Sequence, residues 1–220
     1  MRFAKDGIPT IAFLVLVTVA FAFISPVPTV VMGALTALVL WFYRDPDRAT
    51  PEREGGFFSP ADGKVVEITE AAYPITGPIP EGSGWQLSPE SKAIKVGIFM
   101  NLFSVHVNRA PCAGTVDYLE YIPGKKVAAF APKASEINER HLVGLSTAWG
   151  PVLMVQIAGL VARRIVCRLT RGETLKAGQR YGMIKLGSRV DVYLPRDVKL
   201  AIKMGDQVYA GVSLLGAIER

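Results

Sequence analysis

The chain has 220 residues, of which 25 are Lys or Arg, 19 are Asp or Glu, and half are hydrophobic. This length fits one domain with an appendage, and the composition excludes intrinsic disorder and a small disulfide scaffold. The formal net charge is +6, but the basic residues form no run of five, so an anionic membrane surface is expected as a partner and nucleic acid is not.

The first predicted element is an apolar block from Ile8 to Tyr43, which contains no charged residue in 36 positions. Prolines in Ser25–Pro28 divide it into two runs, Pro9–Ile24 and Val27–Tyr43. Each run is near the shortest length that crosses a hydrocarbon core of about 30 Å. A secretory signal has only one such run. We therefore predict a membrane-anchoring helical hairpin over residues 1–43, with a buried hairpin of a soluble protein as the alternative.

Positive charge flanks this block on both sides, at Arg2, Lys5, Arg44, Arg48 and Arg53. Cytoplasmic flanks of membrane segments carry such charge, so both ends are predicted on the cytoplasmic side of the cell (inner) membrane. Trp41–Tyr43 is expected at the interface as an aromatic anchor. Having only two cysteines also fits a reduced, cytoplasm-facing protein.

Short β-branched or alternating runs, separated by Gly and Pro, follow from Phe57 onward, with no long helical period. We predict strands at Lys64–Ile68, Ala93–Phe99, Gly114–Tyr121, Val152–Ile157, Arg163–Leu169, Arg189–Tyr193 and Val198–Ile202. Tyr73–Pro89 is rich in Pro and Gly and predicts an irregular surface loop. Residues 44–220 are therefore expected to form a mainly β domain, either a barrel or a sandwich.

An internal repeat refines this expectation. Gly172–Gly178 and Gly205–Gly211 both fit the pattern G-[DE]-x-[LV]-x-A-G, which suits quasi-symmetric hairpins. The pattern resembles the half-repeats of lipoyl and biotinyl carrier domains. That resemblance implies a barrel-sandwich (lipoyl-like) arrangement and says nothing about function.

Three segments carry residue types suited to chemistry. Ser59–Val65 contains Asp62 in an Asp-Gly turn, Val105–Pro111 contains His106, and Lys185–Val190 contains a Gly187-Ser188 step before a strand. Taken singly, these segments also fit a turn, a structural histidine and an ordinary loop. Their order along the chain is more specific than any one of them.

Four segments in order, Phe42–Pro46, Ser59–Gly63, Val105–Arg109 and Leu186–Ser188, resemble the phosphatidylserine decarboxylase family in its short, proteobacterial or archaeal-like form. The resemblance runs from about Arg44 to the C-terminus. It implies that the chain cuts itself between Gly187 and Ser188 and converts Ser188 into an N-terminal pyruvoyl group, without a metal. Chains 1–187 and 188–220 would then remain together as a heterodimer.

The resemblance also implies an activity and residue roles. The enzyme would convert phosphatidylserine to phosphatidylethanolamine and CO2 through a Schiff base between the substrate amine and the pyruvoyl group. Ser188 is the expected nucleophile, His106 the expected base and later acid, and Asp62 the carboxylate that orients His106. From charge alone, Arg109, Lys64 or Lys185 could pair with the lipid phosphate; Arg109 and Asn108 are the candidates for substrate binding. Long bacterial members have a second His where Arg109 stands. In this chain, His106 must therefore perform tasks that the long members divide between two histidines.

The chemistry agrees with a built-in carbonyl cofactor. Decarboxylation of an amino acid leaves a carbanion at Cα, and no protein side chain provides an electron sink for it. We find no pyridoxal-phosphate lysine motif in the sequence, whereas a pyruvoyl group supplies a conjugated carbonyl. Gly at position 187 leaves the carbonyl attacked by Ser188 sterically open.

Two alternatives to this enzyme remain at this point. One is a membrane-tethered lipoyl- or biotinyl-like carrier or a non-catalytic adaptor, because Met183–Leu186 faintly resembles a biotin-acceptor turn. Its short spacing to Gly205 disfavours it and leaves Gly187-Ser188 unexplained. The other is an inactive family member with a structural role.

Overall fold

The chain consists of two units. The computed structural model describes residues 2–79, 85, 91–125, 127, 137–160, 164–185 and 187–219. One unit comprises Met1–Asp47 and Phe103–Val105, and the other comprises Arg48–Leu102 and His106–Arg220. The first contains the apolar N-terminal stretch, and the second contains the sheets that carry the candidate catalytic residues.

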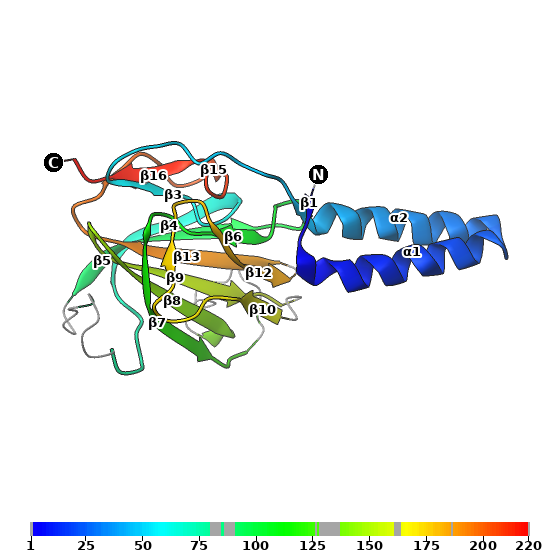
Figure 1. Ribbon diagram of the computed structural model, residues 1–220, viewed down its shortest axis with the longest axis horizontal. Coiled ribbons are helices and arrows are strands. Elements are labelled where there is room, and N and C mark those ends of the chain that lie inside the picture. The colour runs from blue at the N-terminus through cyan, green and yellow to red at the C-terminus, as the bar shows by residue number, and fades with distance from the viewer. Residues whose placement is uncertain are drawn as a thin grey trace. The chain divides into compact units, whose positions relative to one another are not determined.

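The N-terminal stretch forms two helices that run side by side, α1 (Ile8–Ala22) and α2 (Pro26–Phe42), preceded by the 3-10 turn η1 (Lys5–Gly7) (Figure 1). The dividing prolines lie in the first turn of α2, where the missing backbone N–H breaks no helical hydrogen bond. The hydroxyl groups of Thr18 and Thr36 are 2.9 Å apart and join the two helices. The stretch is therefore a helical hairpin, as predicted.

The two ends of the hairpin are tied together. β1 (Arg2–Phe3) pairs antiparallel with β2 (Arg44–Asp45), and Arg2 forms a 3.3 Å ion pair with Asp47. By length and composition, Lys5–Ala22 could cross a membrane, while the second helix is shorter. The pairing of β1 with β2 therefore holds the two ends of the hairpin side by side.

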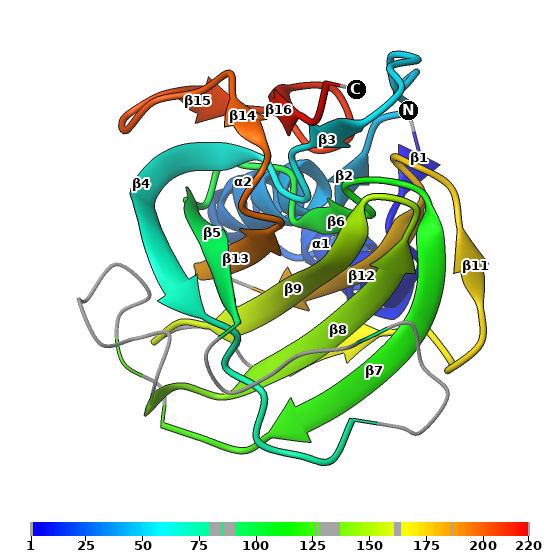
Figure 2. The ribbon, with the colours of Figure 1, turned by 90° about the vertical axis from the view of Figure 1, so that its left-hand side faces the viewer.

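Eight antiparallel strands form one curled sheet (Figure 2). From edge to edge its order is β11 (Thr174–Leu175), β7 (Gly114–Ile122), β8 (Arg140–Thr147), β9 (Gly150–Ala158), β13 (Ser188–Leu194), β5 (Lys92–Met100), β4 (Gly63–Ala72) and β15 (Gln207–Val208). β13 lies between β9 and β5, and all of its residues are buried. The strand that begins at the candidate nucleophile is thus at the centre of the sheet.

Two smaller sheets complete the β structure. One has the order β10 (Arg164–Cys167), β12 (Arg180–Lys185) and β6 (Val107–Arg109), and the other β14 (Lys199–Leu200), β16 (Leu214–Ala217) and β3 (Gly56–Phe58). The prediction of a mainly β fold is confirmed, and every predicted strand overlaps an observed one. Arg163, the first residue of one predicted strand, lies outside the described residues. The lipoyl-like arrangement stays a prediction.

The two copies of the repeat have matching positions at opposite edges of the large sheet. Gly172 N–H donates to the Val116 carbonyl at 2.8 Å, and Gly205 N–H donates to the Val65 carbonyl at 2.9 Å. In each case the repeat contributes a two-residue strand, β11 or β15, that pairs with the first residues of a long bulged strand, β7 or β4. The quasi-symmetry expected from the pattern is present in the backbone.

Both faces of the large sheet are covered. On one face, Val190, Val192 and Leu194 of β13 belong to the larger core. On the other, Tyr193 packs in a second cluster that includes Trp85, Tyr118, Leu142 and Leu153. Trp85 is buried, so this part of the predicted surface loop over Tyr73–Pro89 is in the core, and residues 73–79 contain no helix or strand. Residues 80–84 and 86–89 lie outside the described residues.

A buried charge network crosses the second face beside Tyr193. Arg189 Nε lies 2.5 Å from Asp191 Oδ1, and its Nη2 forms an ion pair with Glu67 Oε2. Lys95 Nζ lies 3.0 Å from Glu67 and 3.3 Å from Asp191. Burial raises the pKa of Asp191, although the Arg189 guanidinium acts in the opposite direction. A slip of β13 by one residue would move these charges into the apolar core, so the network specifies the register that places Ser188.

Candidate active site

Ser188 lies where the chain crosses from one sheet to another. β12 ends at Lys185 in a three-stranded sheet, and β13 begins at Ser188 in the large sheet. Gly187 between them has a φ of +55°, a left-handed conformation that costs other residues about 1–2 kcal/mol. No atom lies within 4 Å of the position that a Cβ would occupy. The Gly187-Ser188 bond thus lies at a sharp turn that only Gly adopts without strain, and Leu186 lies outside the described residues.

The Ser188 side chain is buried and unsatisfied. Its exposed fraction is zero, and its Oγ has no hydrogen-bond partner among the residues that the structure describes. Ser188 pairs with Met100 on β5 and with Ala158 on β9, so it lies at the same end of the sheet as the ends of those strands. A buried hydroxyl without a partner costs about 1–3 kcal/mol, which fits a group held ready for a reaction better than a structural one.

His106 lies beside the last residues of β12. β6 pairs with β12 so that Val107 is opposite Met183, and the His106 carbonyl accepts a 3.3 Å hydrogen bond from the Ile184 N–H. The chain reaches Ser188 four residues after Ile184. His106 is fully buried. The structure therefore brings the histidine segment next to the strand that leads into the predicted cleavage site.

Asn108 belongs to a buried amide pair on the same side. Its Oδ1 accepts a 2.8 Å hydrogen bond from Gln156 Nε2, and its Nδ2 lies 3.8 Å from the Met100 sulfur. Met100 is the strand partner of Ser188. Gln156 is on β9 two residues from Ala158, and its Oε1 is buried without a hydrogen-bond partner in the described part of the chain. The amide pair therefore contacts the residue that lies opposite Ser188 on β5.

Asp62 is held by groups other than His106. Arg48 donates to both of its oxygens at 2.5 and 2.8 Å, and the Ala210 N–H donates to Oδ1 at 2.8 Å. Asp62 precedes β4, which is separated from β13 only by β5. Two strand spacings amount to about 10 Å. No hydrogen bond joins the described Asp62 and His106 side chains, and the orienting role of Asp62 stays a prediction.

Arg109, the other candidate for substrate binding, is also buried. Its Nη1 donates to the Gly178 carbonyl at 3.2 Å, and its backbone N–H donates to the Pro60 carbonyl at 2.9 Å. Thus the structure places Arg109 next to the segment that contains Asp62. Its role and that of Asn108 stay predictions.

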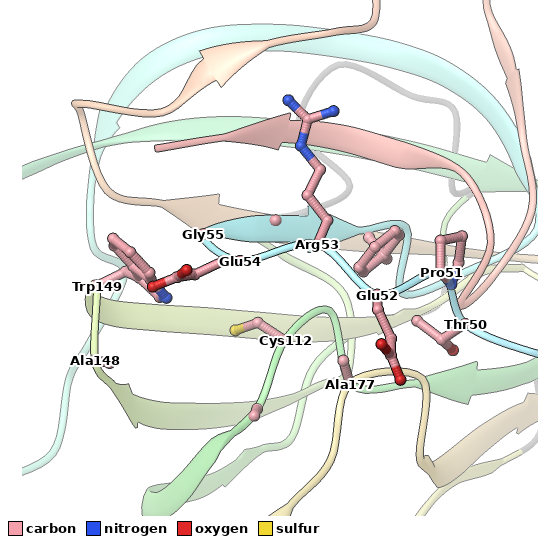
Figure 3. Close-up of a pocket in the computed structure, with 13 residues that line it drawn as sticks. Thr50, Pro51, Glu52, Arg53, Glu54, Gly55, Cys112, Ala148, Trp149 and Ala177 are labelled. Carbon is pink, nitrogen blue, oxygen red and sulfur yellow. The ribbon is translucent and has the colours of Figure 1, made fainter. Parts of the chain in front are cut away.

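A cavity of about 420 Å³ lies elsewhere in this unit, with Thr50, Cys112 and Trp149 among its lining residues (Figure 3). Trp149 precedes the first residue of β9, whereas Ser188 pairs with Ala158 at the last, about 26 Å away along the strand. Burial raises the pKa of the Cys112 thiol to about 12, so this thiol stays protonated. This cavity is separate from the site around Ser188.

Comparison with known proteins gives a consistent result. The family model described as phosphatidylserine decarboxylase matches residues 35–216. A phosphatidylserine decarboxylase proenzyme of Solidesulfovibrio magneticus is 45% identical over 214 residues, covering 96% of this chain and 94% of that protein. Proenzymes of the same name from Desulfotalea psychrophila and Nitratidesulfovibrio vulgaris are 42% and 44% identical, covering 98% and 96% of this chain and 96% and 92% of their own lengths.

The chain belongs to the phosphatidylserine decarboxylase family. Membership makes it a decarboxylase, and the resemblance found in the ordered motifs is confirmed. In this member of the family, His106 lies beside β12, which leads toward Ser188, and Asn108 contacts Met100, the strand partner of Ser188. Asp62 precedes β4, two strands from β13 in the large sheet. Within the described residues, no group of three or more His, Cys, Asp or Glu side chains is arranged to hold a metal ion.

Sequence reasoning missed two residues that contact the candidate site residues: Gln156, which contacts Asn108, and Arg48, which contacts Asp62. Gln156 is a polar residue inside the apolar run of β9, and that interruption is the signal that could have singled it out. Arg48 was assigned only to the positive flank of the hairpin. Its contact with Asp62 depends on the fold and left no local signal.

Replacing Gln156 with Leu is expected to destabilise the protein measurably. The Asn108 oxygen would lose its donor, which costs about 1–3 kcal/mol and lowers the unfolding midpoint by roughly 5 °C for a chain of this size. Calorimetry of Gln156→Leu, Asn108→Leu and the double variant would measure this. We expect the double variant to lose less than the sum of the two single losses, and strictly additive losses would contradict an interacting amide pair.

Proposed function

We propose that this protein cuts itself at Gly187-Ser188 and decarboxylates phosphatidylserine to phosphatidylethanolamine, using a pyruvoyl group derived from Ser188. The observation that carries the proposal is the buried, unpartnered Ser188 hydroxyl directly after a left-handed Gly187. Position 188 suits a pyruvoyl group, because after the cut Ser188 would be the first residue of a chain whose strand β13 is already paired in the sheet. When formed, the group supplies the carbonyl that delocalises the charge left by CO2.

Self-processing needs only residues of this chain. The Ser188 oxygen attacks the Gly187 carbonyl while a base takes the hydroxyl proton, and the Gly187–Ser188 C–N bond breaks to give an ester. Loss of the Ser188 Cα proton then expels the Gly187 carboxylate and leaves dehydroalanine. Tautomerisation and addition of water release ammonia and give the pyruvoyl group. The position of His106 beside the end of β12 supports it as the base.

In turnover, His106 is the proposed acid that returns a proton to Cα after CO2 has left. Asp62 is the proposed orienting carboxylate, with Arg48 fixing its position. Arg109 and Asn108 are proposed to bind the substrate. As both side chains are buried and make internal hydrogen bonds, their proposed role is confined to the polar head group.

The two products of cleavage are proposed to stay together as a heterodimer. The 188–220 chain contributes β13, which forms antiparallel pairs with both β5 and β9 along its length. It also contributes β15, at one edge of the large sheet, and β16, which pairs with β3. Breaking one peptide bond leaves all of these hydrogen bonds in place.

The hairpin is proposed to anchor residues 44–220 to the cytoplasmic face of the inner membrane. The apolar Lys5–Ala22 segment supports membrane association, and the positive flanks support this side and attraction to anionic lipid.

Two measurements test the activity directly. Release of labelled CO2 from carboxyl-labelled phosphatidylserine is expected, and intact mass after borohydride trapping should show two chains with a carbonyl on the smaller. A carrier would give one modified chain, and an inactive relative would give one unmodified chain without CO2 release. Either result would exclude the proposed function.

Deletion of residues 1–43 is expected to give a soluble protein that still cuts itself. The hairpin contributes no side chain to the proposed chemistry, so activity on dispersed short-chain lipid should survive better than activity on vesicles. Mass spectrometry and CO2 release from both substrates would check this. Loss of self-cleavage would show instead that the hairpin supports the catalytic fold.

A further inference from the structure

Two exposed leucines flank the end of the sheet at which Ser188 lies. The strand partners of Ser188 are Met100 and Ala158, and two residues beyond them the chain carries Leu102 and Leu160. Leu102 is 48% exposed and Leu160 is 65% exposed. Two residues span at most about 7 Å, so both leucines lie close to the level of Ser188. We call Leu102 and Leu160 the apolar rim.

The apolar rim continues along the chain into a residue that belongs to the hairpin unit. Phe103 follows Leu102, is 67% exposed, and is grouped with the hairpin. Its carbonyl accepts a 2.5 Å hydrogen bond from Arg44 Nη2, and the Arg44 guanidinium lies 4.2 Å from the centre of the Trp41 ring. Trp and Arg at the end of an apolar helix are typical of the membrane interface. Of the predicted aromatic anchor, Trp41 is exposed while Phe42 and Tyr43 are buried.

We propose that the apolar rim inserts into the surface of the bilayer that holds the substrate. This inference rests on the proposed function and adds the route by which the lipid arrives. Isolated exposed leucines are common on soluble proteins, but these two lie on both sides of the strand that begins at the reactive serine. Leu102 is also followed directly in the chain by Phe103, whose carbonyl accepts a hydrogen bond from Arg44.

Insertion has a clear chemical advantage for a substrate with two acyl chains. Each methylene group that leaves the bilayer loses favourable burial, so extracting the whole lipid would oppose binding. With the apolar rim in the membrane, only the serine head group has to reach Ser188. The acyl chains stay in the bilayer throughout the reaction.

Two positions at opposite ends of β9 allow a matched depth measurement. Leu160→Cys and Ala148→Cys, each combined with Cys167→Ser, would carry one environment-sensitive fluorophore, while the native Cys112 is buried. The full-length protein would be placed in vesicles of phosphatidylcholine and phosphatidylglycerol that contain acyl-chain brominated lipid. We expect severalfold stronger quenching at position 160 than at 148. Equal quenching at the two positions would overturn the proposal.

A second measurement separates membrane contact from folding. In the double variant Leu102→Ser and Leu160→Ser, the self-cleaved fraction should be unchanged. The concentration of phosphatidylserine vesicles at half-maximal rate should rise on the order of tenfold, with no change for monomeric short-chain substrate. An equal loss on both substrates, or no loss on either, would contradict membrane insertion of the apolar rim. If wild-type protein neither cuts itself nor releases CO2, the proposed function is wrong. The quenching result would still show whether the apolar rim enters the membrane.

Discussion

The variant Ser188→Ala should remain a single uncut chain of 220 residues and release no CO2 from phosphatidylserine. Alanine removes the only hydroxyl placed directly after Gly187, so the N-to-O acyl shift has no nucleophile. The wild-type protein should migrate as two chains. The smaller chain should resist Edman sequencing, because a pyruvoyl group has no N-terminal amine. Gel migration and intact mass measure both outcomes.

Ser213 provides a matched control within the same small chain. Its Oγ accepts a hydrogen bond from the Tyr209 N–H at 2.9 Å and is far along the sequence from the cut. Ser213→Ala should process as fully as the wild-type protein. If the wild-type chain stays full length and still releases CO2, the pyruvoyl mechanism is wrong.

Asp62→Asn is expected to slow self-cleavage by a factor on the order of 10⁴, by analogy with serine proteases in which the same change favours the wrong histidine tautomer. Asn can still accept the Ala210 hydrogen bond and form the turn, but it loses its charge opposite Arg48. The cleaved fraction over time measures the rate. Near-normal processing would make Asp62 a turn former held by Arg48, with no part in the reaction.

His106→Ala separates the two steps that this histidine is expected to serve. A variant that cuts itself but cannot decarboxylate would confine His106 to protonating Cα. His141 on β8 is the matched control, since it is the only other histidine in the chain and lies beside the Tyr121 ring. His141→Ala should leave both rates near normal. Normal cleavage and CO2 release in His106→Ala would remove His106 from the mechanism.

Where a residue pattern depends on local spacing, the sequence predicted the structure well. The uncharged block and its prolines gave the helical hairpin, and the alternating runs gave most long strands. β8 and β12 are the strands of six or more residues that were missed, and in β8 Gly144 interrupts the apolar pattern. A Cβ on Gly144 would come within 2.5 Å of the Trp85 ring, so the interruption has a packing cause. Trp85 is nearly 60 residues away in sequence, and no local pattern reveals the contact.

The candidate site shows the same limit. The order of motifs predicted Ser188 as the nucleophile, together with the segments around it, through its resemblance to a known family. The supporting contacts join residues far apart in the chain, such as Gln156 with Asn108 and Ala210 with Asp62. The first pair joins β9 of the large sheet to β6 of a three-stranded sheet, and the second depends on the pairing of β15 with β4. Only the folded structure supplies these pairings.

If the chain cuts itself as proposed, the central position of β13 makes refolding after the cut very different from refolding before it. Before the cut, chain connectivity holds β13 near its place between β5 and β9, so folding is independent of concentration. After the cut, a denatured enzyme consists of two fragments that must associate. The smaller fragment must supply the strand that pairs with both β5 and β9 in the middle of the sheet. The lifetime of the mature enzyme is therefore governed by how slowly it unfolds. The uncut precursor refolds as one chain, whereas the proposed mature enzyme refolds only when its two fragments associate.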